Sequence, residues 1–380
     1  MQEKEFLIDI ASKSQYQNQS AQYHEAYTKW RMNENNRFGY KFTKDTREHA
    51  YAFGEGFEHN NASDAERKTL HDCSSLFGGG LLIASLIRLL QAFFDSRAGH
   101  MLSGTSLNLT GSVRNSDILA AIVLMLFYPV SVIICFFICQ FFIKLPKAVL
   151  LPTNKRIPKH IPLLLFGVMS GIAVVCYMAA VFMRYVIGTK YMFLPSGIVI
   201  TDLKWLNLFY FFLQYIISPI LQALLLNGLI MQTLRQFGDS TAIFFTTIIE
   251  AILALNLTNI GTHLVIALIV CLMTIKTGSI FTAIFSRITV NLIFFLLSFV
   301  ESLYNGQDGE LYMLLICITI MGIALFCLGK LLSYDHFDFS IINVKTELQF
   351  TQKLGVFFTS MPMIEWFAAS SVAWLYIVVA

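Results

Sequence analysis

The sequence predicts an all-α membrane protein: a polytopic bundle of eight or nine spanning helices with a small N-terminal extramembrane region. Its composition is the first observation, because 56% of the 380 residues are hydrophobic and only 13% are charged. A soluble domain has about 45–50% apolar and about 25% charged residues. The second observation is a series of apolar segments long enough to cross a hydrocarbon core about 30 Å thick, which takes about 20 helical residues. The third is that Lys and Arg gather in short connections between these segments.

Polarity divides the chain into four parts. Residues 1–75 carry both signs of charge, and we interpret them as a cytoplasmic region, a solvated appendage rather than a catalytic domain. Flanking spans occupy 76–204, a core 205–300 and C-terminal spans 301–380. The expected spans are 76–95, 117–143, 161–184, 205–234, 241–259, 263–276, 279–300, 311–333 and 355–379. The last of them contains a proline and a glutamate, so it either crosses the membrane or lies along its interface.

Basic residues set the expected orientation. The loop "KLPKAVLLPTNKRIPKH", residues 144–160, carries five Lys and Arg residues, and such loops stay on the cytoplasmic side. Counting spans from this loop places residues 1–75 inside and the acidic segment "ESLYNGQDGE" outside. The polar N-terminal region shows no signal peptide, which agrees with a cytoplasmic N-terminus. The sequence therefore predicts a multi-pass protein of the cell membrane, of the bacterial plasma membrane type.

Charge and cysteine content argue against several classes of function. A net charge of +3 without a basic block predicts no nucleic-acid partner. The seven cysteines fit neither a disulfide framework nor a zinc site. Cys135 and Cys139 lie one helical turn apart and could form a metal pair, but we interpret them as small buried hydrophobes. We expect no metal and no cofactor, and the lipid bilayer as the first partner.

The segment "SPILQALLLNG", Ser218 to Gly228, places two amides in an otherwise apolar run. It resembles the first motif of the CPBP family, the CAAX protease and bacteriocin-processing (Abi) intramembrane proteases. That motif has a small residue, Pro, two apolar residues, then E-E-x-x-x-R and Gly. The family's F-x-x-x-H motif falls on "ILALN", and its H-x-x-x-N motif on "TGSIFTAIFSRITVN". The resemblance runs from Ser218 to Asn291.

Most polar positions of these motifs differ from the family. Neutral residues replace the glutamate pair, and an amide replaces the arginine. An amide and an arginine replace the two histidines, while the final asparagine is kept. In this order the positions are Gln222, Ala223, Asn227, Asn256, Arg287 and Asn291.

The resemblance implies a Glu that activates water, a His that assists and an Asn that helps to hold the oxyanion. A general base must accept a proton near neutral pH, which amides and alanine cannot do, and arginine stays protonated. His263 is the only histidine within spans four to seven, too few for a metal site. We therefore expect no catalytic residue and a pseudoenzyme. A plainer interpretation is that Gln222 and Asn227 form ordinary hydrogen bonds between helices.

Glu250 and Arg287 are charges within predicted spans. Each lies about 12–14 Å from the cytoplasmic end of its helix, at 1.5 Å per residue. Buried charges at such depth usually find partners or water, so the two side chains could meet. A structural ion pair is the interpretation we favour over a conduction or substrate site.

The predicted function is a non-catalytic CPBP-like protein that binds a partner membrane protein or peptide through the old substrate cavity. Family analogy suggests immunity to bacteriocins or a scaffold for envelope synthesis. The alternative is an intramembrane protease with unconventional residues, Glu250 acting as the base. A transporter would be expected to show paired broken spans in two related halves, and the sequence shows no such repeat.

Overall fold

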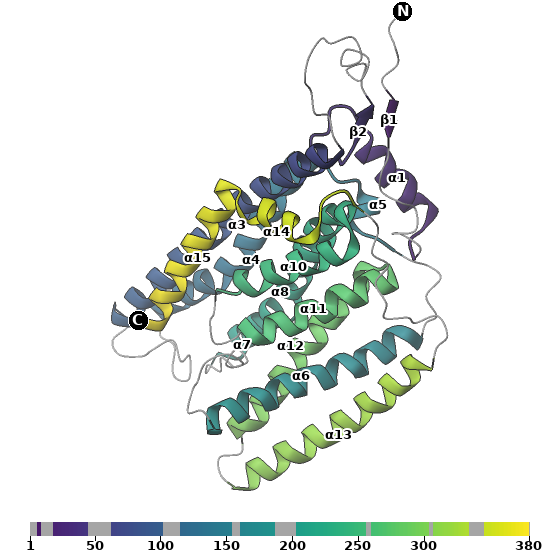
Figure 1. Ribbon diagram of the computed structural model, residues 1–380. Helices are drawn as coiled ribbons and strands as arrows, with labels where there is room; N and C mark the ends of the chain where they lie inside the picture. The colour runs from purple at the N-terminus through teal and green to yellow at the C-terminus, as the bar shows by residue number, and fades with distance from the viewer. Residues whose placement is uncertain are drawn as a thin grey trace, which may run out of the picture.

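The computed structural model describes residues 6–8, 18–44, 62–101, 115–153, 160–186, 203–255, 260–303, 307–333 and 346–379. Helices dominate these ranges, which confirms the all-α membrane bundle (Figure 1). The short antiparallel pair of β1 (Phe6–Ile8) and β2 (Phe42–Lys44) was not predicted from the sequence.

The helices follow the predicted spans closely. In chain order they are α1 (Ala21–Arg31), α3 (Ala62–Met101), α4 (Asn115–Ile143), α5 (Lys147–Leu150), α6 (His160–Val186), α7 (Lys204–Phe212), η2 (Leu213–Ile217), α8 (Ser218–Gln222), η3 (Ala223–Ile230), α9 (Met231–Leu234), η4 (Arg235–Phe237), α10 (Asp239–Leu253), α11 (Ile260–Thr277), α12 (Ile280–Leu303), α13 (Gln307–Leu332), α14 (Phe350–Phe358) and α15 (Met361–Val379).

Within the described residues, seven helices are long and apolar enough to cross a membrane. They are α3, α4, α6, the continuous run from α7 to η4, α11, α12 and α13. Two further expected spans correspond to α10, which has only 15 residues, and to α14 with α15. The segment 355–379 is broken at Thr359 and Ser360, two residues before its proline, so a nine-residue helix precedes the apolar α15. This is the architecture of a multi-pass membrane protein.

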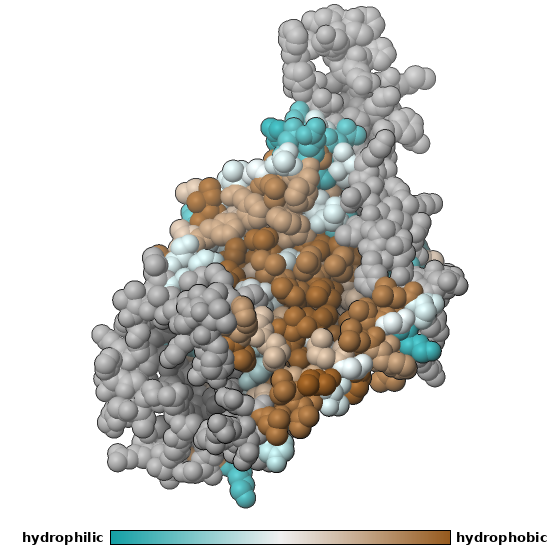
Figure 2. Space-filling view, turned by 60° about the horizontal axis from the view of Figure 1, so that its bottom comes forward, coloured by the Kyte–Doolittle hydropathy of each residue, from teal (hydrophilic) through white to brown (hydrophobic). Residues whose placement is uncertain are grey.

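The helices form a layered bundle. Figure 1 shows α3, α14 and α15 on one side and α6 with α13 on the other, with α10, α11 and α12 between them. Large apolar side chains are exposed on the outer helices, as Phe141 and Leu163 illustrate at 70% and 71% exposure. Figure 2 shows such residues across the middle of one face, with hydrophilic residues at its margins. Exposed apolar surface on this scale is expected where lipid replaces water.

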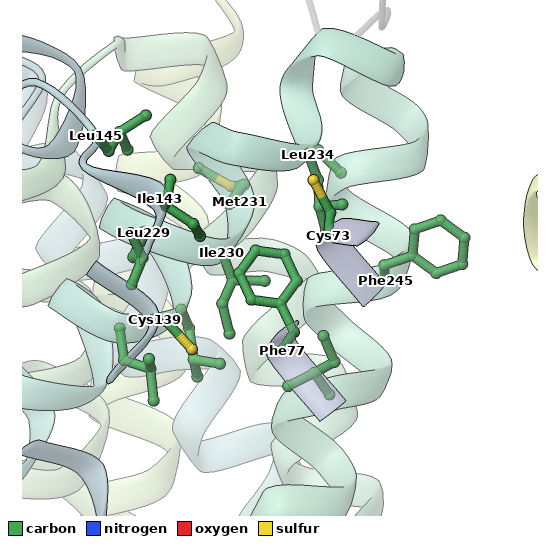
Figure 3. Close-up of a cluster of buried hydrophobic side chains, with 14 of the residues drawn as sticks. Cys73, Phe77, Cys139, Ile143, Leu145, Leu229, Ile230, Met231, Leu234 and Phe245 are labelled. Atoms are coloured by element: carbon green, nitrogen blue, oxygen red, sulfur yellow. The ribbon is translucent and has the colours of Figure 1, made fainter. Parts of the chain in front are cut away.

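The main core lies between α3, α4, the span from α7 to η4 and α10. Figure 3 shows part of it, where Phe77, Cys139, Ile230 and Phe245 come from these four parts of the chain. Both thiols of the Cys135–Cys139 pair are buried in this cluster. Helices distant in sequence thereby enclose this apolar cluster.

The N-terminal region is partly built into this core. Tyr23, Tyr27 and Trp30 on α1 are buried, as are Phe38 and Tyr40 after it, and all five belong to the same cluster. The expected solvated appendage is therefore wrong for residues 18–41. Aromatic side chains in a polar, mixed-charge sequence produced this error, because their burial depends on surfaces that distant helices supply.

Candidate functional site

The fourth span contains two π-helical segments, η2 and η3, on either side of Pro219. Proline has no backbone N–H and its ring obstructs the carbonyl four residues earlier, and a widened turn relieves that conflict. Ser218 Oγ also donates to the carbonyl of Leu213 at 2.8 Å. Single π-turns inside helices are frequent at functional sites. The motif "SPILQALLLNG" therefore occupies irregular helix rather than a regular span.

Asn227 lies within η3 and contacts a buried ion pair. Arg287 on α12 donates from Nη1 to Oε1 of Glu250 on α10, and from Nη2 to Oε2 at 2.7 Å. The same guanidinium reaches Oδ1 of Asn227, from Nη2 at 2.9 Å and from Nε at 3.3 Å. All three side chains are at most 3% exposed. Three helices are thus joined through one two-pronged arginine contact, the strongest geometry for a carboxylate partner.

Both the oxygen and the nitrogen of the Asn227 side-chain amide have partners. Its nitrogen donates to Cys271 Sγ at 3.3 Å and lies 3.9 Å from Met231 Sδ. Sulfur is a weak acceptor, so the amide orientation is set mainly by Arg287. Gly228 follows directly, and a Cβ there would lie 2.9 Å from the carbonyl oxygen of Leu150. Glycine at this motif position permits α5 to approach the helix closely.

A second polar group surrounds Gln222. Its Nε2 donates to the hydroxyl of Tyr128 on α4. The guanidinium of Arg88 on α3 lies 4.6 Å from the centre of the Tyr128 ring, a cation–π arrangement. Neither Arg88 nor Tyr128 was among the predicted site residues. Arg88 stands in the predicted span 76–95 and could have been found by the argument used for Glu250, whereas no pattern marked Tyr128.

The remaining motif positions are Ala223, Asn256 and Asn291. Ala223 is buried in a second apolar cluster with Ile280 and Ala283. Asn291 follows Arg287 by one helical turn and is half-buried. Asn256 lies outside the described residues. The structure thus brings together Asn227 and Arg287 with Glu250, while Gln222 contacts a different partner.

The chemistry available to this arrangement is limited. Glu250 is the carboxylate of the network, and Arg287 engages both of its oxygens. Over the described ranges, no group of three His, Cys, Asp or Glu side chains is placed to hold a metal ion. The geometry is that of a charge-neutral polar network within an apolar bundle.

The N-terminal segment closes one end of the core. Tyr23 Oη donates to Gln232 Oε1 at 2.8 Å, and Tyr27 Oη to the Gln232 carbonyl at 2.6 Å. Trp30 Nε1 donates to the Ile143 carbonyl at 2.9 Å. Burial raises the pKa of Tyr23 to about 12, against the lowering effect of the Arg235 charge. Residues near the chain start therefore fix the helix ends beside the π-helical span.

Comparison with known families matches residues 204–293 to the model described as "Type II CAAX prenyl endopeptidase Rce1-like". The matched segment begins with α7 and ends within α12, so it contains Gln222, Asn227, Glu250, Arg287 and Asn291. No curated protein and no solved structure matches the chain.

Proposed function

We propose that this membrane protein is a non-catalytic member of the CPBP family, on the premise that residues 204–293 form its Rce1-like core. Its role is to bind a partner membrane protein or peptide at the old substrate cavity. The observation that carries the proposal is the Asn227–Arg287–Glu250 network. A protease of this type needs a carboxylate that can take a proton from water. Here the carboxylate of the network is held at both oxygens by a cation.

The replaced motif positions support the same conclusion. Gln222 stands where the motif has glutamate, and its amide donates to Tyr128. An amide has no basic site near neutral pH, and Arg287 stays protonated at a position where the motif has histidine. We interpret the network as a structural replacement for the catalytic residues.

The rival activity is proteolysis with Glu250 as the base. A water molecule attacking a peptide would have to compete with a charged donor for either carboxylate oxygen. Releasing Glu250 from Arg287 would leave an unpaired charge in the apolar interior, which costs several kcal/mol. This cost disfavours the rival.

A peptidase assay tests the proposal directly. The purified full-length protein, in nanodiscs, should cleave neither a prenylated C-terminal peptide nor a leader-type peptide above the protein-free blank. An active family member prepared in the same way is the positive control. Cleavage that Glu250→Gln abolishes would replace the proposal by the rival.

The binding role needs a separate experiment. A photo-crosslinking amino acid at Gln222 should give a specific protein or peptide adduct in native membranes. The matched control is the same amino acid at Phe326, a lipid-exposed position on α13 that is 65% exposed. Equal adduct patterns at both positions would argue against a partner at the old cavity. Bacteriocin immunity and envelope scaffolding are the two roles that family analogy suggests for such a partner.

We also propose that residues 1–75 and the loop 144–160 face the cytoplasm of the cell membrane. Contacts at the α1 end of the bundle support a shared side. Asn18 Nδ2 donates to the Lys276 carbonyl, and Ile280 N donates to the Pro152 carbonyl, both at 2.9 Å. The C-terminal end of α11 therefore meets the N-terminal segment, and the start of α12 meets the basic loop.

A further inference from the structure

An open groove of about 760 Å³ lies between the beginning of α3 and the short helix α14. Its lining is polar and mostly basic on the α3 side and uncharged on the α14 side. The lining residues are Asp64, Arg67, Lys68, His71, Gln352, Gly355, Val356 and Thr359. The α3 residues recur every three or four positions, so they share one side of the helix.

The groove carries an excess of positive charge. Within the ranges that the structure describes, no ion pair joins Arg67, Lys68 or His71 to an acidic side chain. Asp64 supplies the one acidic group of the lining. Glu66 is buried and pairs with Lys353 at 3.1 Å. Two permanent cations and an imidazole therefore face the groove, with one carboxylate beside them.

The two walls of the groove are fixed to one another. Lys353 on α14 contacts Glu66 on α3 and also donates to the Phe237 carbonyl at 2.6 Å. About two turns further along α3, Ser74 Oγ donates to the Phe357 carbonyl and lies 2.7 Å from Ser360 Oγ. The groove is thus formed before any ligand binds, which reduces the entropic cost of binding.

The groove opens onto the lipid-facing surface. Between Cys73 and Ile87, α3 carries no charged residue. Lys68 and His71 lie on the same helical face as Ile83 and Leu86, which are 39% and 45% exposed. A molecule in the groove can therefore place a polar end against the basic residues and an apolar end along α3.

We infer that this groove binds an anionic phospholipid, with its phosphate held by Arg67, Lys68 and His71 and an acyl chain along the exposed face of α3. Cationic side chains at a membrane surface attract anionic headgroups, and guanidinium groups suit phosphate oxygens. The continuity with the apolar face selects a lipid rather than free phosphate.

Thermal unfolding of the full-length protein in detergent tests the inference. Added phosphatidylglycerol should raise the melting temperature more than phosphatidylcholine with the same acyl chains. In the double variant Arg67→Gln/Lys68→Gln, the apparent affinity for phosphatidylglycerol should fall roughly 30-fold. Each basic contact contributes about 1 kcal/mol, which corresponds to a factor of a little over five in affinity. Lys330→Gln, at an exposed lysine on α13, is the matched control and should keep the full preference.

A second variant distinguishes loss of the lipid site from misfolding of the double variant. A Cβ at Gly355 would meet no heavy atom within 4 Å, so Gly355→Leu fills the groove while every charge stays. It should also remove the preference for phosphatidylglycerol. Equal responses to the two lipids in the unmodified protein, or an unchanged preference in both variants, would overturn the site. Equal stabilisation by inorganic phosphate alone would overturn the lipid assignment.

Discussion

Arg287 on α12 holds both carboxylate oxygens of Glu250 on α10, although 37 positions separate the two residues in the chain. The pair is nearly inaccessible, and Asn227 accepts two further hydrogen bonds from the same guanidinium. Buried charges are costly to separate, so this contact constrains how three helices pack.

The first prediction concerns this pair. Arg287→Met alone leaves an unpaired carboxylate and should lower the free energy of unfolding by about 3–5 kcal/mol. The double variant Glu250→Leu/Arg287→Met leaves apolar surface and should be more stable than the single variant. Thermal unfolding in detergent measures both. The single variant Glu250→Leu completes the comparison: if the two single effects simply add to give the double effect, the residues do not interact.

The second prediction concerns the contact between the N-terminal segment and the turn that joins α11 to α12. Gly278 has φ +64°, and a Cβ there would lie 2.2 Å from the Asn18 carbonyl oxygen. Gly278→Ala should therefore cost more than about 1 kcal/mol and speed proteolysis of residues 18–44. Gly329→Ala, within α13 and with open space around it, should be neutral or stabilising by up to about 1 kcal/mol. Equal effects of the two variants would contradict a tight contact at Gly278.

The third prediction is a loss of stability at high pH. An unfolded tyrosine ionises near pH 10, whereas burial raises the pKa of Tyr23 to about 12 in the folded protein. Between these values the unfolded chain releases a proton that the folded chain keeps, so stability falls as pH rises. The full window corresponds to roughly 2–3 kcal/mol. Melting temperatures from pH 9 to pH 11.5 should fall less steeply in Tyr23→Phe; parallel curves would contradict the assignment to Tyr23.

The fourth prediction tests orientation. All seven native cysteines are buried, so the unmodified protein serves as a blank for a membrane-impermeant thiol reagent. Applied to intact cells, the reagent should miss a cysteine placed at Thr153 and label one placed at Asn305, which lies in the acidic segment outside the described residues. Labelling of the cysteine at Thr153 but not of the one at Asn305 would show that the topology is the inverse of the proposed one.

The resemblance of the core to the family could be predicted from the sequence because helical motifs keep a fixed spacing. Positions 222, 227 and 287 were identified from their place in two short patterns, and the matched family segment contains them. The partner of Gln222 was not accessible, because Tyr128 lies 94 positions earlier on another helix. Arg88 was accessible in principle as a charge in an apolar segment, but its contact with the Tyr128 ring was not.

The sequence by itself determined the all-α membrane class, the approximate helix limits and the placement of Glu250 and Arg287 within apolar helices. Hydrocarbon thickness and helical rise fix these properties locally, so composition and spacing suffice. Only the tertiary structure decided that Tyr23, Tyr27 and Trp30 fill the core, and that α14 closes a basic groove against α3. Both depend on contacts between residues more than 100 positions apart. Helix packing creates such contacts, and no local pattern of polarity encodes them.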